Sequence, residues 1–204
     1  ALLNEWGDYT PAYHEIREIL CAYQGIEMTE LPESPKLQTI GNVELTEFAS
    51  LFDNLSNIAE KHYAPVPESM EYFNQNFGLI YYETVISGKY DISPLNIKGV
   101  HDFGYVYFDD KYKKRISRLE YTSESKGLKA LFSKKNSGKF LMSAINGNRK
   151  IGVLVDAMGR VNYGEHMTDR KGITDIYIGN QRQMGYDVYT IPLDNLDKLE
   201  YKAD

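Results

Sequence analysis

Two clusters of polar residues contain the side-chain types that acid–base chemistry or ligand binding would need. The first is the adjacent pair His101-Asp102, in which the histidine could act as a base and the carboxylate could orient it. The alternative is that both residues cap the end of a strand. The second cluster is the segment MGRVNYGEHMTDRKG at 158–172. Such a segment can bind a ligand or satisfy its own polar groups, and its composition favours the second interpretation.

The segment 158–172 is therefore interpreted as a polar loop that fixes where two strands leave a sheet. The residues given a structural role in it are Arg160, Asn162, Tyr163 and Asp169. We expect Arg160 to be largely buried and paired with a carboxylate, with Asp169 as the first candidate, because a buried charge is tolerated only when it is paired and fully hydrogen-bonded. Asn162 should hydrogen-bond backbone groups of its own loop. Gly159 and Gly164 should adopt turn conformations that other residues avoid.

Other chemical signatures are weak in this sequence. No nucleophile elbow, P-loop, HExxH or EF-hand pattern occurs, and the single cysteine, Cys21, belongs to no cluster with zinc spacing. We therefore expect no catalytic residue, no metal and no cofactor. The remaining histidines are expected at surface or packing positions; they are His14, His62 and His166. Asn54-Leu55-Ser56 matches the glycosylation sequon, which makes Asn54 a candidate glycosylation site inside a predicted helix.

Charge is distributed unevenly along the 204 residues. Residues 111–150 contain 12 Lys and Arg against two acids, whereas the net charge of the whole chain is −6. This basic segment could meet a polyanion, or it could be a solvated hairpin and loop that offsets acidic neighbours. The second interpretation is favoured because no aromatic residues are interleaved with the lysines of 134–139, and the Lys-rich stretch 123–139 is expected to be a mobile loop. No apolar run has the length of a membrane span, and the first ten residues do not resemble a signal peptide.

Two helices are predicted in the first third of the chain. The first spans 11–24, with Thr10 as cap, Pro11 in the first turn and Gly25 at the end. Its apolar stripe is Tyr13, Ile16, Ile19, Leu20 and Tyr23, and no nearby segment is an obvious partner for that stripe. A linker follows over 26–44. A second helix is predicted to start at the cap Thr46 and to end before two prolines; its stripe is Phe48, Leu51, Phe52, Leu55 and Ile58.

From residue 77 onward the hydrophobic period changes to two, which predicts strands. The strand-like segments are FGLIYYETVI, LNIKGVHDF, GYVYFDD, YKKRISRLEY, IGVLVDAMG, ITDIYIGN and YDVYTIPL. Asp109-Asp110 and Asn146-Gly147 are turn signals, and Gly152 indicates a bulge or a close backbone approach. A helical turn is predicted at 69–73. Seven short strands without long intervening helices predict a mainly β fold, a jelly-roll-like β-sandwich preceded by a helical arm.

Three motifs in a fixed order resemble a known family. VHDFGYVYFDD at 100–110, MGRVNYG at 158–164 and DRKGITDIYIG at 169–179 are similar to the all-β region that follows the catalytic barrel in glycoside hydrolase family 35, the lysosomal-type β-galactosidases. The N-terminal ALLNEWGDYTPAYHEIREIL is similar to the last barrel segment of that family. Departures are Asp156-Ala157 where Glu-Asn is frequent, Phe103 where a basic residue is usual, and a longer Lys-rich stretch between Leu119 and Arg149.

The resemblance implies a division of the chain and a role for it. Residues 1–25 would be the end of a TIM barrel, 26–68 a linker with one helix, and 69–204 the all-β domain. The catalytic glutamates of a retaining exo-β-galactosidase would lie in the barrel, ahead of residue 1, so the chain would be a non-catalytic accessory region. Glu5, Trp6 and Asp8 would form a structural cluster at the barrel rim, with sugar stacking as the alternative role of Trp6.

The resemblance also implies partners and leaves alternatives open. The partners would be the catalytic barrel, a second β-domain of the same protein, further copies in a homo-oligomer, and galactosides bound by the parent enzyme. It implies a lysosomal, secreted or periplasmic location, and neither a nucleic acid nor a membrane is expected as a partner. A carbohydrate-binding module is one alternative function. A polyanion-binding domain that uses 111–150 is another.

Overall fold

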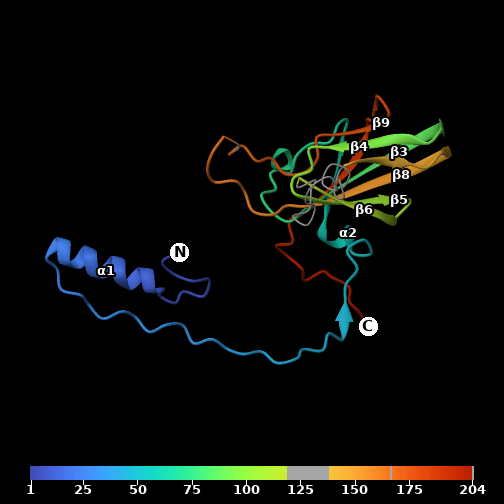
Figure 1. Ribbon diagram of the computed structural model, residues 1–204. Coiled ribbons are helices and arrows are strands. Elements are labelled where there is room, and N and C mark those ends of the chain that lie inside the picture. The colour runs from blue at the N-terminus through green and yellow to red at the C-terminus, as the bar shows by residue number, and fades with distance from the viewer. Residues whose placement is uncertain (119–137, 166, 204) are drawn as a thin grey trace, which may run out of the picture. The chain divides into compact units, whose positions relative to one another are not determined.

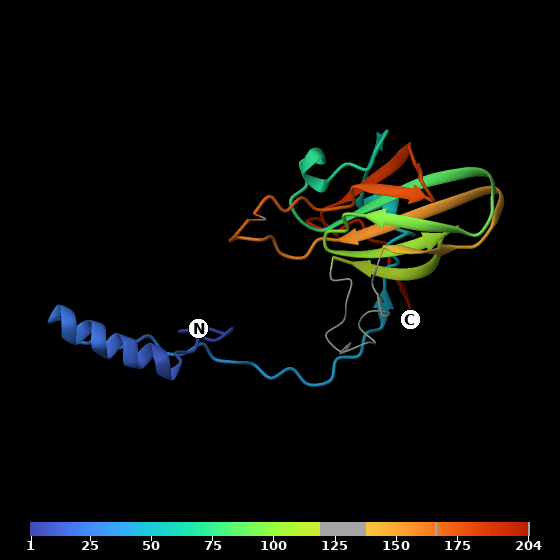
Figure 2. The ribbon, with the colours of Figure 1, turned by 45° about the horizontal axis from the view of Figure 1, so that its top comes forward.

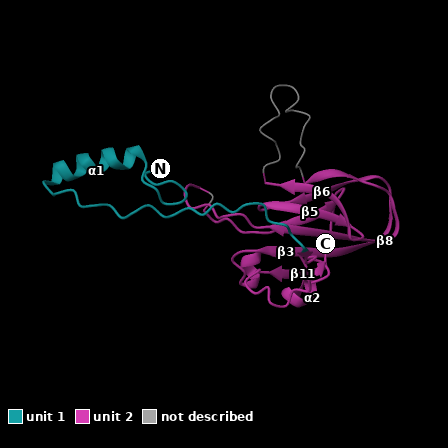
Figure 3. Ribbon diagram, turned by 90° about the horizontal axis from the view of Figure 1, so that it is seen from below, with its two compact units in different colours: residues 1–46 teal, residues 47–204 magenta. Residues whose placement is uncertain are grey.

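The computed structural model describes residues 1–118, 138–165 and 167–203 (Figure 1). Most of the predicted Lys-rich loop at 123–139, and His166, therefore lie outside the described residues. The chain divides into two compact units, residues 1–46 and residues 47–204 (Figure 3). Each unit is described separately below. Among the described residues, no helix combines the length and the apolar character that crossing a membrane requires.

The first unit contains one helix, α1, at Pro11–Gln24. Pro11 occupies the first turn and Gly25 ends the helix in the left-handed conformation at φ 67°, as predicted. Thr10 stands at the cap position, but its hydroxyl donates to the carbonyls of Ala1 and Leu2 and makes no bond to the helix. No residue of α1 is buried, and within this unit its apolar stripe is exposed except for the half-buried Tyr13.

The second unit is built on an antiparallel six-stranded sheet in the order β2-β11-β3-β8-β5-β6. Its strands are β2 (Glu60–Ala64), β3 (Leu79–Tyr90), β5 (Phe103–Phe108), β6 (Lys111–Ser117), β8 (Ile145–Asp156) and β11 (Tyr186–Ile191). The two 12-residue strands, β3 and β8, pair along their whole length and form the centre of the sheet. Figure 2 shows them as the long green and orange ribbons.

A four-stranded sheet with the order β10-β9-β4-β7 forms the second layer. Its strands are β4 (Ser93–Lys98), β7 (Lys139–Met142), β9 (Asp175–Ile178) and β10 (Gln181–Arg182). The smaller elements of the unit are β1 (Glu47–Phe48), paired with β12 (Lys202–Ala203), the short helix α2 (Leu55–Ile58) and the 3-10 turn η1 (Met70–Phe73). The turn η1 confirms the helical turn predicted at 69–73.

The main core lies between the two sheets, because alternate residues of their strands face each other there. Ile80 and Tyr82 of β3 belong to this core together with Leu95 of β4 and Ile176 of β9, and each of them is fully buried. Tyr81, between the two β3 residues, belongs to a smaller cluster on the opposite face of the large sheet. The period of two thus places successive side chains on opposite faces. A mainly β fold with sandwich architecture is confirmed.

The second predicted helix is wrong in length and in its start at Thr46. The chain forms β1, then turns, then the four-residue α2, and from Glu60 it becomes strand β2. β2 pairs with β11 and so forms one edge of the large sheet. The predicted stripe covers the outer face of that sheet instead, where the Phe52 ring lies 5.3 Å from that of Tyr81. Tertiary pairing has overridden a helical pattern that was only local.

Of the two predicted turns, one is confirmed and one is wrong. Asp109 and Asp110 have φ of 49° and 63° and join β5 to β6 in a hairpin. Asn146-Gly147 instead lies inside β8, where Gly147 pairs with Gly88 of β3 and both glycines have positive φ. At Gly152 a side chain, and not another stretch of backbone, makes the close approach, since a Cβ atom there would lie 2.2 Å from the Tyr81 hydroxyl oxygen.

Candidate functional site

The three motifs singled out in the sequence meet in one group of charged side chains at one end of the sandwich. This group, called the Lys171 cluster below, consists of Glu71, His101, Asp102, Arg118, Arg160, Asp169 and Lys171. Its members come from η1, from the residues just before β5, from the residue just after β6, and from the segment between β8 and β9. The antiparallel pairing of β5 with both β6 and β8 brings these strand ends together.

Lys171 is the centre of the cluster and is completely buried. Its Nζ lies 2.7 Å from Asp102 Oδ2, 2.8 Å from Asp169 Oδ2 and 2.8 Å from the Gly159 carbonyl oxygen. An ammonium group has three hydrogens to donate, and each has an acceptor here. A charge can be buried at tolerable cost only when it is paired and hydrogen-bonded in this way. Lys171 therefore ties the β8–β9 segment to the start of β5.

Arg118 forms ion pairs with the same two carboxylates, on the side that faces solvent. Its Nη2 lies 2.5 Å from Asp169 Oδ1, and its Nη1 lies 3.2 Å from Asp102 Oδ1. The two carboxylates are thus bridged twice, once by a buried ammonium and once by a guanidinium that is one-third exposed.

His101 does not pair with its neighbour Asp102 as a base with its orienting group would. Its Nδ1 lies 3.2 Å from Asp169 Oδ1 and 3.0 Å from Arg118 Nη2. Asp102 points into the cluster instead, where its Oδ2 accepts from Lys171 and from the backbone N–H of Met158. His101 thus contacts the carboxylate of Asp169, whereas the carboxylate of Asp102 binds Lys171 and Met158. Together the two residues connect the start of β5 to the β8–β9 segment and to Arg118 after β6.

Arg160 departs from its predicted position. Its side chain is 38% exposed, and its Nη1 lies 2.5 Å from Glu71 Oε1. Toward Asp169 it donates only to the backbone carbonyl, at 3.0 Å. Arg160 thus pairs with a carboxylate as expected, but with Glu71 and not with the first candidate Asp169, because Lys171 and Arg118 already occupy both carboxylate oxygens of Asp169. Glu71, which the sequence analysis did not single out, also accepts the backbone N–H of Lys171.

The tip of the polar loop is exposed, unlike its second end at Asp169 and Lys171. Asn162 and Tyr163 are both solvent-exposed, with Tyr163 at 89% of its full accessible surface. Gly164 has a φ of 96° and adopts a turn conformation, as expected. Gly159 has no positive φ, and the space around its Cα is open, so the expectation of a special conformation there is wrong.

The electrostatics of the cluster favour the ionised carboxylates. Burial of Asp169 opposes ionisation, but hydrogen bonds from Lys171 and Arg118 outweigh it and hold the pKa of this carboxyl well below its usual range. Burial likewise opposes ionisation of Glu71, and the hydrogen bond from Arg160 contributes to a net lowering of its pKa. These two acids and Asp102 form ion pairs with Lys171, Arg118 and Arg160.

Asp169, Arg118 and His101 also line a surface pocket of about 680 Å³ beneath the exposed loop tip. Asp169 shows this pocket almost no surface, because its side chain is only 1% exposed. In the part of the chain that the structure describes, no three His, Cys, Asp or Glu side chains are placed to hold a metal ion. The arrangement is suited to fixing strand ends, and it presents mainly Arg118 and His101 to a ligand.

Two further candidate residues lie away from the cluster. Trp6 is 53% exposed, in a turn where Asn4 Oδ1 accepts the backbone N–H groups of Trp6 and Asp8. Asn54 is 1% exposed, and its Nδ2 donates to the carbonyls of Ser50 and Glu200. Both amide hydrogens of Asn54 are used in the fold, so the structure contradicts its interpretation as a glycosylation site.

Comparison with known proteins gives consistent matches. Residues 67–193 match the family described as "Beta-galactosidase, first all-beta domain". A "Beta-galactosidase" of Xanthomonas manihotis is 29% identical over 202 residues, which are 98% of this chain and 30% of that protein. "Beta-galactosidase 8" of Oryza sativa subsp. japonica is 31% identical over 85% of this chain and 25% of its own length. A human "Beta-galactosidase-1-like protein 2" is 28% identical over 95% of this chain and 28% of its own length. The chain spans less than a third of the length of these relatives.

Proposed function

Because the chain belongs to the β-galactosidase family, which it matches in the first all-beta domain, we propose that it is a non-catalytic scaffold region of such an enzyme. In this proposal the parent protein hydrolyses terminal β-galactosyl residues, and this region supports the domain that carries out the reaction. Residues 1–25 are the end of the catalytic barrel and the residues up to 46 connect it; the all-β domain begins earlier than the predicted residue 69, because β2 at Glu60–Ala64 is an edge strand of the large sheet.

The Lys171 cluster is the observation that supports a scaffold role. Its motifs contain the residue types that could carry out chemistry, yet their carboxylates bind a buried ammonium and two guanidinium groups of the same chain. A retaining glycosidase needs two carboxyl groups about 5–5.5 Å apart on either side of the scissile bond, with one free to act as a nucleophile. Asp102 and Asp169 are committed to Lys171 and Arg118 instead, so they serve to join segments.

The exposed apolar stripe of α1 supports the proposal that this helix packs against the catalytic barrel. Ile16 and Leu20 are 43% and 51% exposed, although a stripe of this kind is normally buried against another element. We propose that the preceding part of the enzyme covers this stripe, as the last barrel helix would require. Glu5, Trp6 and Asp8 then belong to the rim of that barrel, and sugar stacking on Trp6 remains the alternative.

An activity measurement tests the proposal directly. The purified 204-residue chain should release no product from an aryl β-galactoside, whereas an enzyme that also contains the barrel should release it. Hydrolysis by the chain that is lost on Glu5→Gln would contradict the proposal. Hydrolysis that survives Glu5→Gln would point to a contaminating enzyme, and a second purification from an unrelated host would decide the matter.

The two alternative functions predict different binding. A polyanion-binding domain would lose affinity for heparin steeply between low and physiological salt. Within the described residues, β6 presents the exposed Lys111 and Lys113 for such a contact. A carbohydrate-binding module centred on the polar loop would lose affinity for galactosides on Tyr163→Ala. The scaffold proposal expects neither effect.

A further inference from the structure

A small pocket collects basic side chains where β5 turns into β6 and where β7 leads into β8. It has a volume of about 230 Å³ and is lined by Phe108, Asp109, Lys111, Lys113, Ser143 and Arg149. Lys111 and Lys113 are exposed at the start of β6, Arg149 belongs to β8, and Ser143 directly follows β7. Three separate segments therefore bring hydrogen-bond donors to one pocket.

The wall of this pocket is positively charged. It contains three basic side chains and one carboxylate, that of Asp109, which gives a net charge of +2. Asp109 is already engaged, since its Oδ2 lies 3.5 Å from Arg149 Nε and its Oδ1 accepts the backbone N–H of Lys150. In the part of the chain that the structure describes, neither Lys111 nor Lys113 has a carboxylate within ion-pair distance. Positive charges held close together repel one another, so the pocket favours an anion that offsets them.

Aromatic rings behind the pocket hold the positive charges in place without neutralising them. The Arg149 Cζ atom lies 5.7 Å and the Lys113 Nζ atom 6.0 Å from the centre of the buried Phe108 ring. The Phe140 ring stacks on Phe108, and Lys114 Nζ lies 5.0 Å from the centre of Phe140. Burial lowers the pKa of Lys114, which shows that this region already disfavours positive charge.

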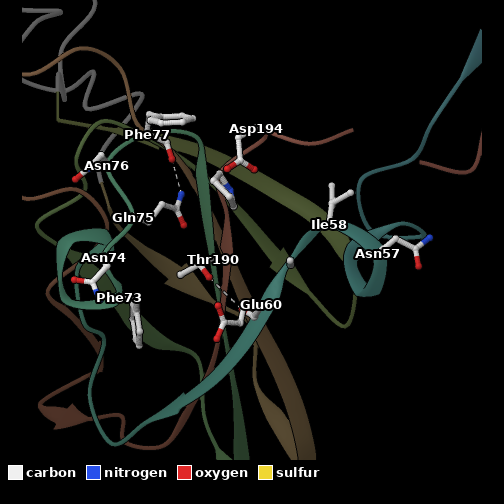
Figure 4. Close-up of a pocket in the computed structure, with 12 residues that line it drawn as sticks. Asn57, Ile58, Glu60, Phe73, Asn74, Gln75, Asn76, Phe77, Thr190 and Asp194 are labelled. Atoms are coloured by element: carbon white, nitrogen blue, oxygen red, sulfur yellow. Dashed lines mark hydrogen bonds between the residues drawn. The ribbon is translucent and has the colours of Figure 1, made fainter. Parts of the chain in front are cut away.

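A larger pocket of the same unit has the opposite charge (Figure 4). Its volume is about 460 Å³, and its wall contains the carboxylates of Glu60 and Asp194 but no lysine or arginine. The whole chain has a net charge of −6. Basic side chains are therefore not a general feature of the pockets in this chain, and their concentration at the start of β6 is local.

The size and the donors of the basic pocket define its ligand. Liquid water occupies about 30 Å³ per molecule, so the pocket has room for one tetrahedral ion with a few waters. Ser143 Oγ accepts from Arg149 Nη1 at 2.9 Å, which leaves the hydroxyl hydrogen for a ligand. Arginine and lysine are the side chains that bind phosphate, and a wall of net charge +2 favours a doubly charged group. We propose that this pocket binds one phosphate group through Lys111, Lys113 and Arg149.

This site is independent of the scaffold role and differs from a polyanion-binding surface. A polyanion makes many phosphate or sulfate contacts at once and therefore loses affinity steeply as salt is added. The basic pocket takes a single group. Free phosphate and a phosphorylated sugar both carry that group, so both belong in the test.

A titration of the 204-residue chain followed by proton–nitrogen NMR tests the proposal. The additions are inorganic phosphate, glucose 6-phosphate and acetate, all at one ionic strength set with sodium chloride, so that general screening is constant. The backbone amides of 108–113 and of Arg149 should shift with both phosphates and much less with acetate, which carries one charge. Equal affinity for the two phosphates would show that the free ion is sufficient, and tighter binding of glucose 6-phosphate would assign the site to a phosphorylated sugar.

Matched variants locate the binding. Lys111→Gln with Lys113→Gln should weaken the affinity for phosphate roughly 2- to 30-fold, the range that two exposed ion pairs supply. Lys98→Gln with Lys198→Gln is the control, because it removes the same charge from two exposed lysines that do not line the pocket. Arg149 is left unchanged, since its contacts with Asp109 and Ser143 are part of the fold.

Three results would overturn the proposal. The first is an effect of phosphate no larger than that of acetate. The second is equal phosphate affinity in the wild type and in the variant that lacks Lys111 and Lys113. The third is heparin binding far tighter than phosphate binding and lost steeply between low and physiological salt, which would assign these lysines to a polyanion.

Discussion

Lys171 shows at the scale of one residue how the polar motifs are used. The sequence indicated that 158–172 satisfies its own polar groups, and Asp169 is indeed buried and fully paired. The distant partners could not be predicted, because Arg118 reaches Asp169, and Asp102 reaches Lys171, only after β5, β6 and β8 have aligned. The one local signal was the spacing of two residues between Asp169 and Lys171 in the DRKG segment. In an extended chain, residues at this spacing point to the same side.

Removing the buried ammonium should be costly. Lys171→Met leaves Asp102 and Asp169 with only Arg118 between them, and breaking a buried pair in this way costs about 3–5 kcal/mol of unfolding free energy. Arg160→Met is the matched control; its partner Glu71 is partly exposed, so the loss should be at most about 1 kcal/mol. Urea unfolding monitored by circular dichroism measures both values. Equal losses in the two variants would contradict the central role of Lys171.

Stability should also depend on acid through Asp169. The pKa of its carboxyl is lower in the folded chain than in the unfolded chain, where it is about 3.9. Its contribution is therefore fully present above about pH 5 and is lost as the pH falls through the acid range. Urea unfolding between neutral and acid pH should show this decline, and Asp169→Asn should have a flatter profile. If the wild type and Asp169→Asn lost stability equally steeply with falling pH, Asp169 would not contribute to the acid dependence.

At the scale of elements, alternation predicted the strands well where both sheet faces are packed. β3 and β11 follow the predicted segments, since their apolar residues face the core or the smaller outer cluster, whereas β8 begins at Ile145, six residues before the segment predicted from Ile151. β2 was missed because its five residues are mostly polar, and it is a strand only because β11 provides the backbone partners. The helix predicted over the same region had a good apolar stripe. In the structure most of the stripe residues lie in turns and in the short helix α2, and from there they pack on the sheet.

Gly78 joins two elements so closely that any side chain should disturb them. It has a φ of 90°, and a Cβ atom would meet two backbone oxygens of the β11 end. Gly78→Ala should therefore lower the unfolding free energy by about 1–3 kcal/mol through overpacking alone. Gly159→Ala is the control, because its φ is ordinary and the space around it is open. Thermal unfolding of both variants checks this, and an unchanged midpoint for Gly78→Ala would refute it.

At the scale of the whole molecule, the apolar stripe of α1 is the surface that the proposal assigns to the barrel. Within the unit of residues 1–46 neither Ile16 nor Leu20 is buried, so Ile16→Ser with Leu20→Ser should leave the melting temperature of this chain unchanged. The same double change in an enzyme that includes the barrel should lower both melting temperature and yield, because each buried apolar side chain contributes roughly 1.5–3 kcal/mol. Glu15→Gln is a suitable control on the same helix. Equal behaviour in both proteins would argue against the barrel as the partner of α1.

The order of strands in the large sheet has a consequence for synthesis. β11 lies between β2 and β3, although it is made more than a hundred residues after β2. A nascent chain on the ribosome therefore carries β2 and β3 with open edges until Ile191 has emerged, and open edges invite pairing with other chains. Chains that terminate before Tyr186 should depend on chaperones or aggregate, whereas loss of the last few residues after β11 leaves the large sheet complete.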